Sequence, residues 1–406
     1  MNPRQRAALR AAFVLAGIGL GLATYLTVRH FAAAQGGRSV CSVSVTLNCD
    51  VVNTSEYAEL LGIPISALGA ALYLLILVLS GWSLAARPSL VPSLLSHLTV
   101  AAAGSVAYSV FLAGVSHFVL RHWCLFCIGL YAVNLGLLVT AAVGAGIPIA
   151  EQLAILRRDW ATIRSKRWVF AALVGAGVLV GGVAATAAVR REHRRDEFVK
   201  TWKALEIAPV VVRGNEPTLG SADAPVTVVD YFDFLCPHCK KAATVLERLV
   251  REYPGQVRVV VKHVPLDASC NPWANPHPGA CKATAAALCA ARQGHYWEMH
   301  DWLFLDQAEI DDNNVAAKIA EIGAKVGVDA AALESCMTEP AILDQIQSEI
   351  REGIAELRIE STPAIFVNGR GIMGALDMET FRTVIDEALA LAKNPAPAPA
   401  PPHPGG

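Results

Sequence analysis

The chain has 406 residues, of which 54% are hydrophobic and only 17% are charged, so it is too apolar to form one soluble globule. Its formal net charge of −1 provides no basic field for nucleic acid, and we expect no such partner. Apolar residues crowd into residues 11–190, whereas charged residues concentrate after Arg190. This asymmetry predicts a membrane domain joined to a soluble domain.

Five apolar stretches approach or exceed the ~20 residues that a membrane-spanning helix needs. They cover residues 11–34, 65–86, 94–120, 123–147 and 168–189. Residues 31–35 look like a signal-peptide cleavage site, but the apolar segment before them exceeds the usual ~7–15 residues, which favours an uncleaved span. We expect a membrane domain at 1–150, a cytoplasmic loop, fifth span and linker at 151–205, a soluble domain at 206–393 and a disordered Pro/Ala-rich tail at 394–406.

Basic residues predict the orientation of these spans. Arg4, Arg6 and Arg10 precede the first span, and further basic residues lie between the fourth and fifth, at 157–167. The positive-inside rule places both segments in the cytoplasm. We therefore expect a multi-pass protein of the inner (cytoplasmic) membrane, with its soluble domain in the periplasm and its loop cysteines on that same outer side.

Two cysteine pairs belong to the membrane half. Cys124 and Cys127, one helical turn apart at the start of the fourth span, can close into a disulfide, and a helix N-terminus favours their thiolate form. Cys41 and Cys49 can cross-link if their loop turns back, and this spacing fits a redox pair and a structural staple equally. Tyr131 follows Cys127 by one turn, so both side chains can face one pocket. Ser66 is a candidate helix cap at the start of the second span.

Together these residues resemble bacterial homologues of vitamin K epoxide reductase (VKOR) that are fused to a thioredoxin-like domain. The resemblance covers about residues 10–147 and is carried by Cys41, Cys49, Ser55, Ser66, Gly69, Tyr73, Cys124, Cys127 and Tyr131. It implies a four-helix membrane bundle around a quinone (ubiquinone or menaquinone), with Ser55, Ser66 and Tyr131 as quinone-binding residues.

The same resemblance implies an order of electron transfer. Cys41 would receive electrons from a partner thiol, Cys49 would pass them to Cys124, and Cys127 would face the quinone. One residue departs from the pattern: Ile65 stands where vertebrate relatives place an asparagine against a naphthoquinone. The resemblance therefore does not by itself extend to epoxide reduction or to the choice of quinone.

The soluble half carries a third cysteine pair. Predicted strands cover 209–212 and 225–232, and the second runs into Cys236-Pro237-His238-Cys239 at the start of a helix that ends near residue 252. A strand, a C-x-x-C motif and a helix are typical of thioredoxin-like redox domains. We expect Cys236 to be an exposed, stabilised thiolate, and Cys239, one turn deeper, to resolve mixed disulfides.

The Cys-Pro-His-Cys motif resembles the DsbA-like thiol oxidases, and Thr362-Pro363 at the start of a strand resembles the cis-proline segment of thioredoxins. This resemblance covers about residues 215–393. It implies that Pro363 is cis and lies beside the active disulfide, that helices at 282–354 form an insertion, and that a helix at 377–393 closes the domain. The expected fold is thus an all-α four-helix membrane bundle (VKOR-like) with a fifth transmembrane helix, joined to an α/β thioredoxin-like domain of the DsbA type.

Four cysteines remain outside these pairs. Their even number favours two structural disulfides, for which we expect Cys270–Cys281 and Cys289–Cys336 among three possible arrangements. A zinc site formed by these cysteines and His277 is the alternative. We otherwise expect no resident metal.

The leading functional hypothesis is a membrane thiol oxidase. Reduced extracytoplasmic proteins would give electrons to Cys236/Cys239, then to Cys41/Cys49, then to Cys124/Cys127, and finally to the quinone. Two alternatives stay open: a reductase that moves electrons outward, and a metal-binding membrane protein that uses the two C-x-x-C pairs as thiolate ligands. An inert membrane anchor for a soluble oxidase would leave Cys124 and Cys127 unexplained.

Overall fold

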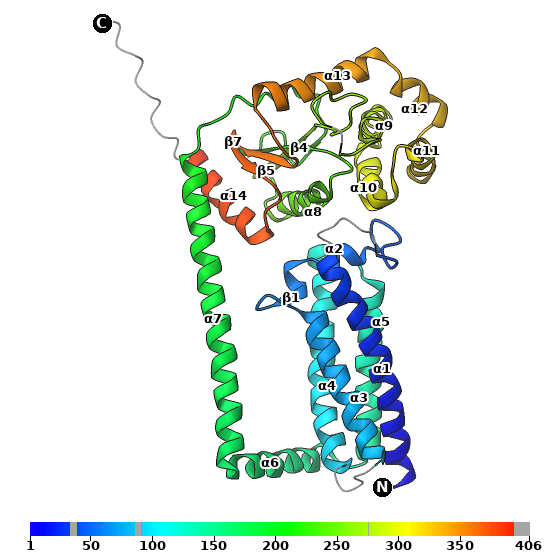
Figure 1. Cartoon of the computed structure of the whole chain (residues 1–406), viewed down its shortest axis with the longest axis vertical. Helices are drawn as coiled ribbons and strands as arrows, with labels where there is room; N and C mark the ends of the chain where they lie inside the picture. Colours follow the sequence, from blue (N-terminus) through cyan, green and yellow to red (C-terminus); the bar gives the residue numbers. More distant parts are fainter. Residues whose placement is uncertain (33–38, 86–90, 275, 394–406) are drawn as a thin grey trace, which may run out of the picture. The chain divides into compact units, whose positions relative to one another are not determined.

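A computed structural model describes the chain except for residues 33–38, 86–90, 275 and 394–406 (Figure 1). The predicted disordered tail therefore lies outside the described residues. The chain divides into two compact units, Met1–Glu192 and His193–Gly406.

In the part of the chain that the structure describes, five helices are long and apolar enough to cross a membrane, as predicted. They are α1 (Pro3–Ala32), α3 (Ile65–Ala85), α4 (Val91–Gly114) with its π-helical continuation η4 (Val115–Leu120), α5 (Leu125–Ala145) and α7 (Arg167–Ala204). The first four pack side by side as a bundle (Figure 1). Small residues let these helices approach closely: a Cβ at Gly144 on α5 would come within 2.3 Å of the Ala8 Cβ on α1.

Two details of the membrane unit differ from the sequence-based expectation. The segment between spans four and five forms a helix, α6 (Ile149–Ser165), which contacts α4 through the Ser93–Asp159 hydrogen bond. The prediction that Ser66 caps a helix is wrong, because α3 already begins at Ile65. The Ser66 hydroxyl instead accepts a hydrogen bond from the Thr27 hydroxyl on α1, at 3.0 Å.

The segment between α1 and α3 lies against the start of α5. It contains α2 (Cys49–Asn53), η2 (Glu56–Ala58) and the antiparallel pair β1 (Glu59–Leu60) and β2 (Ile63–Pro64). Asn48 caps α2 by accepting from the backbone N–H groups of Asp50 and Val51. The Trp123 N–H donates to the Thr46 carbonyl at 2.8 Å, which holds this segment beside Cys124.

The second unit is built on a five-stranded sheet in the order β3-β5-β4-β6-β7. Its strands are β3 (Thr218–Leu219), β4 (Val226–Phe232), β5 (Val257–His263), β6 (Ala364–Val367) and β7 (Arg370–Met373). The central strands β4 and β5 are parallel and the other pairs are antiparallel. Near-continuous burial of β4 and β5 explains their runs of valine.

Helices complete the unit, as the sequence predicted. The helix after the C-x-x-C motif is α8 (Pro237–Glu252), and the closing helix is α14 (Met378–Lys393). The insertion between β5 and β6 comprises α9 (Ala280–Arg292), α10 (Tyr296–Asp306), η5 (Gln307–Glu309), α11 (Val315–Val326), α12 (Ala330–Met337), α13 (Pro340–Arg351) and η6 (Glu352–Glu356).

The strand predicted at 209–212 is wrong. The backbone there forms no ladder: Ala208 donates to the Gly369 carbonyl, and the Val211 carbonyl accepts from the Lys262 ammonium. Lys262 is fully buried and also donates to Glu352 at 2.6 and 2.8 Å. A buried ammonium needs several hydrogen-bond acceptors. Lys262 therefore donates to a backbone carbonyl that would otherwise be available for pairing with a neighbouring strand.

Candidate functional site

The first cysteine pair of the membrane unit is a disulfide between Cys41 and Cys49, whose Cα atoms are 5.7 Å apart. The Asp50 carboxylate accepts from the Ser39 N–H at 2.9 Å and from the Ser42 hydroxyl at 2.8 Å. It therefore fixes the Cys41 segment onto the helix that begins at Cys49.

The second pair lies beside this disulfide. Cys124 is the N-cap of α5, and its sulfur accepts from the Cys127 N–H at 3.1 Å. Both residues are free thiols in the structure. Cys124 belongs to the same buried cluster as Cys41 and Cys49, and Cys127 packs against that cluster. The four cysteines of the membrane unit thus gather at one end of its bundle.

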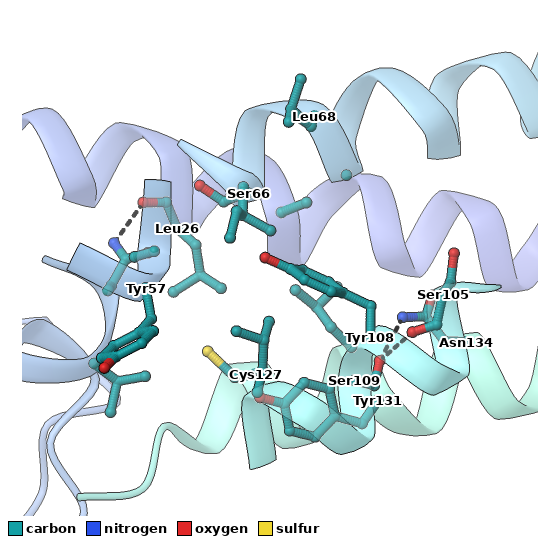
Figure 2. A pocket seen from close by; sticks show the side chains of 18 of the residues that line it. Leu26, Tyr57, Ser66, Leu68, Ser105, Tyr108, Ser109, Cys127, Tyr131 and Asn134 are labelled. Atoms are coloured by element: carbon teal, nitrogen blue, oxygen red, sulfur yellow. Dashed lines mark hydrogen bonds between the residues drawn. The ribbon is translucent and has the colours of Figure 1, made fainter. Parts of the chain in front are cut away.

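Cys127 also faces a cavity of about 300 Å³ between the membrane helices. Three residues that the sequence analysis named for a quinone, Ser55, Ser66 and Tyr131, line this cavity, and so does Ile65. Figure 2 shows the Cys127 sulfur pointing into it near Tyr131, with the Ser66 hydroxyl on the opposite wall. The volume is at the lower end of the ~300–1,000 Å³ range of small-molecule pockets.

Sequence reasoning missed a polar chain along one wall of the cavity. The Tyr73 hydroxyl donates to Asn134 Oδ1 at 2.7 Å, and Asn134 Nδ2 donates to the Ser109 hydroxyl at 3.0 Å. Ser105 and Tyr108 line the same cavity (Figure 2). A signal was present, because polar side chains inside membrane spans are costly and usually mark a site.

The third pair lies at the junction of β4 and α8 in the second unit. Cys236 is the N-cap of α8, Pro237 is its first residue, and Cys239 is fully buried one turn deeper. The Thr362–Pro363 peptide bond is cis, and the Cys236 thiol donates to the Thr362 carbonyl at 3.3 Å. This segment covers the sulfur, so the exposure expected for Cys236 is wrong: it is 5% exposed. His238 is exposed.

The two thiols of this pair have opposite pKa shifts. A hydrogen bond from Cys239 outweighs burial and, with further donors at the start of α8, lowers the pKa of Cys236 to about 6. Burial, followed by the hydrogen bond to Cys236, raises the pKa of Cys239. At neutral pH the thiolate is therefore favoured on Cys236, whereas Cys239 keeps its proton.

A buried carboxyl group lies behind the pair. Asp230 on β4 is 2% exposed, and its Oδ1 has no hydrogen-bond partner among the described residues. Burial, and then the negative charge of Cys236, raise the pKa of Asp230 to about 8. A carboxyl group in this state can take up or release a proton near neutral pH.

A second buried carboxylate organises the loop before Cys236. Asp233 accepts from the Leu235 N–H at 2.6 Å, from the Leu266 N–H at 2.7 Å and from His277 Nδ1 at 2.9 Å. Burial opposes the charge of His277, but the hydrogen bond to Asp233 outweighs it and raises the pKa of His277. Sequence reasoning considered His277 only as a zinc ligand.

The structure joins Cys270 to Cys281 and Cys289 to Cys336, the two pairs that the sequence analysis favoured. All four sulfurs are used in these bonds and His277 is bonded to Asp233, so the alternative zinc site has no ligands left. Among the described residues, one group of side chains lies close enough together to hold a metal ion. It includes no cysteine of either C-x-x-C pair.

Comparison with known families assigns both units. Residues 10–142 match the vitamin K epoxide reductase family, and residues 213–387 match a thioredoxin family. The chain is a VKOR-family domain fused to a thioredoxin domain. The resemblance seen in the sequence and the expected fold class are therefore confirmed. Both are families of oxidoreductases, and the chain is a multi-pass membrane protein with a soluble thioredoxin domain.

Curated relatives match only part of this chain. A Na(+)/H(+) antiporter NhaA 3 of Salinispora tropica is 33% identical over 43% of the chain and 25% of its own length. The NhaA of Herminiimonas arsenicoxydans is 29% identical over 41% of the chain and 24% of its own length. The chain thus spans about a quarter of the length of these relatives.

Solved structures resemble the chain over a similar share. The α-DsbA1 of Wolbachia pipientis is 21% identical, with a TM-score of 0.40, and the match covers 45% of this chain and 96% of that one. A thioredoxin-like oxidoreductase from Silicibacter pomeroyi is 26% identical, with a TM-score of 0.37, over 43% of this chain and 92% of that one.

Proposed function

We propose that this chain is a membrane thiol oxidase that forms disulfides in extracytoplasmic proteins and passes the electrons to a quinone. The position of Cys127 carries the proposal. Its side chain faces a cavity between membrane helices, and one turn before it Cys124 lies in the cluster that holds the Cys41–Cys49 disulfide. A thiol pair placed in this way can exchange with a disulfide on one side and meet a lipid-soluble oxidant on the other.

Each step before the quinone is an attack of a thiolate on a disulfide sulfur. Two thiols of a client protein become a disulfide as the Cys236–Cys239 disulfide is reduced. The reduced pair then reduces Cys41–Cys49 by attack at Cys41. The Cys49 thiolate next attacks Cys124 in the Cys124–Cys127 disulfide and displaces Cys127, and the Cys41 thiolate then attacks Cys49, which releases Cys124 and restores the Cys41–Cys49 disulfide. The reduced Cys124/Cys127 pair finally gives two electrons to the quinone, which takes up two protons and leaves as the quinol.

The chemistry of the thioredoxin domain supports this direction over a reductase. A lowered pKa of Cys236 stabilises the reduced pair, which makes its disulfide a better oxidant. Asp230, with its pKa raised to about 8, is suited to accept the proton when Cys239 attacks the mixed disulfide.

The cavity offers hydrogen-bond donors to a quinone, the cofactor that the VKOR family generally uses. Tyr131, Tyr108 and Ser66 carry hydroxyl groups that can donate to a quinone carbonyl. The Ser55 hydroxyl already donates a hydrogen bond to the Val52 carbonyl at 2.8 Å. We therefore propose that Ser55 shapes the cavity wall and does not donate to the quinone. Ubiquinone and menaquinone are the two candidates.

The distribution of basic residues and the length of α7 support the topology that this route requires. Arg4, Arg6 and Arg10 on α1 and the basic residues on α6 favour the cytoplasm for both segments. From there α7, with 38 residues, is long enough to cross and bring the chain to the side of the cysteine pairs. The thioredoxin domain would then be periplasmic.

The test is quinone-dependent oxidation of a reduced, disulfide-containing substrate by the full-length protein in lipid nanodiscs. We expect Cys127→Ala to abolish both quinone reduction and substrate oxidation. The double variant Cys270→Ala/Cys281→Ala, which removes a disulfide outside the route, should retain both. The reverse pattern would refute the route, and parallel assays with ubiquinone and menaquinone identify the acceptor.

A further inference from the structure

A group of three metal-ligating side chains lies in the thioredoxin domain and takes no part in the proposed electron route. Glu247 belongs to α8, and His300 and Asp301 are consecutive on α10. One ligand atom from each lies within 4.8 Å of the other two. We propose that this group binds a divalent transition-metal ion of the zinc class, which ties α8 to α10.

The imidazole of His300 is held in place as a ligand would be. The residue is 2% exposed, and its ring centroid lies 4.8 Å from that of Phe304 and 5.7 Å from that of Phe234. An apolar ring would fill this aromatic cluster at a lower desolvation cost. The histidine instead presents Nδ1 to the Asp301 carboxylate at 2.9 Å, at the edge where Glu247 arrives from α8.

The two carboxylates are open enough to admit an ion. The side chains of Glu247 and Asp301 are 26% and 30% exposed, against 3% for His300. Arg251 Nη1 lies 3.8 Å from the Glu247 carboxylate. A divalent cation between the Glu247 and Asp301 carboxylates would stabilise the ionised forms of both groups.

The donor set selects the class of ion. One imidazole nitrogen and two carboxylate oxygens suit zinc, which binds nitrogen at ~2.0–2.1 Å and oxygen at ~2.0–2.2 Å. Calcium and magnesium prefer about six or more oxygen ligands, which this group does not supply. Small rotations of the two partly exposed carboxylates would bring the three atoms onto one ion, with water in the fourth position.

The expected consequence is mechanical. Near its N-terminal end α8 is already joined to α10, because Lys240 Nζ donates to the Leu305 carbonyl at 3.4 Å. Glu247 lies two turns further along the same helix, so an ion there would add a second tie. Because α8 begins at the Cys236–Cys239 pair, this tie would brace the helix that carries the redox site.

The experiment titrates the full-length protein with Zn²⁺ by calorimetry, after all cysteine pairs have been oxidised so that no thiolate competes. We expect one saturable site per chain in the wild type. Glu247→Gln and Asp301→Asn should each weaken Zn²⁺ binding at least about tenfold. The matched control is Glu298→Gln, an exposed glutamate on the same helix α10, which should bind Zn²⁺ like the wild type.

Two further measurements identify the ligands and guard against misfolding. Co²⁺ in the same site should give the d–d spectrum of a nitrogen and oxygen site without a sulfur-to-cobalt charge-transfer band. Zn²⁺ at ~100 times its Kd should raise the unfolding temperature of the thioredoxin domain by about 5–10 °C in the wild type and in Glu298→Gln. Glu247→Gln should fold in the presence of a chelator and show no such shift.

A wild-type protein without a saturable Zn²⁺ site would overturn the proposal. Zn²⁺ binding of unchanged affinity in both Glu247→Gln and Asp301→Asn would also overturn it, since the ion would then lie elsewhere. Because the oxidised protein is used and no turnover is measured, either result is independent of the proposed electron route.

Discussion

The pKa of Cys236 is the property on which the oxidising direction depends most directly. The hydrogen bond from Cys239 is the largest cause that lowers it from the ordinary 9.0 to about 6. At pH 7 the thiolate then exceeds the thiol about tenfold. The whole difference corresponds to about 4 kcal/mol in favour of the thiolate, because each factor of ten is ~1.4 kcal/mol.

Only part of this energy acts at neutral pH. A thiol whose pKa is lowered by folding stabilises the reduced form fully above about pH 9, and that stabilisation disappears as the pH falls through about 6. At pH 7 the reduced form gains one factor of ten, or about 1.4 kcal/mol, equal to about 30 mV for a two-electron couple. We therefore expect the oxidising power of the Cys236–Cys239 disulfide, relative to an unperturbed pair, to grow between pH 6 and pH 9.

The assay is the rate of alkylation of Cys236 by iodoacetamide as a function of pH, read from its peptide by mass spectrometry in the reduced full-length protein. The rate should be half-maximal near pH 6. In Cys239→Ala the midpoint should move upward, because the hydrogen bond that most lowers the pKa is lost. A wild-type midpoint at about pH 8 or above, or an unchanged midpoint in Cys239→Ala, would refute the reasoning.

Three other substitutions test separate parts of the structure. His277→Gln removes the imidazole, with its raised pKa, that Asp233 binds beside the loop before Cys236, and the alkylation midpoint of Cys236 should rise. His193→Gln on the exposed part of α7 should leave that midpoint unchanged. Tyr131→Phe should raise the KM for quinone about tenfold, because one hydrogen bond to the quinone is lost. The amount of client protein oxidised in each catalytic turnover should change little. Glu352→Gln leaves the ammonium of Lys262 buried with a weaker partner, so the free energy of unfolding of the thioredoxin domain should fall by about 3–5 kcal/mol, measured by thermal or denaturant unfolding. Unchanged stability would show that Glu216, 3.6 Å from the Lys262 ammonium, is a sufficient partner.

Local sequence patterns were enough to predict the elements for which residue type and spacing strongly favour one structure. A stretch of about 20 apolar residues favours a spanning helix, and a C-x-x-C motif between a strand and a helix puts Cys236 at the helix start. The polar residues of the cavity wall could have been noticed in the sequence, but the contact of Tyr73 with Asn134 could not, because it depends on how α3 and α5 are rotated in the bundle. The segment 209–212 misled for a related reason: its valines favour a strand, but the distant Lys262 takes the Val211 carbonyl.

Cys124 and Cys236 share one local arrangement, in which a cysteine is the N-cap of a helix and its partner lies one turn inside. This arrangement alone therefore cannot determine the order of the proposed electron transfer. The surroundings of the second cysteine differ. Cys239 is fully buried, and this burial is the largest cause that raises its pKa, so its role in the proposed route is to resolve a disulfide that has formed at Cys236. Cys127 opens onto the cavity and can reach a molecule that enters from the bilayer. A large apolar substitution in that cavity, such as Ser66→Leu, should therefore block quinone reduction while Cys49 still exchanges with Cys124 in a single turnover. Equal loss of both steps would mean that the cavity shapes the thiol pair itself.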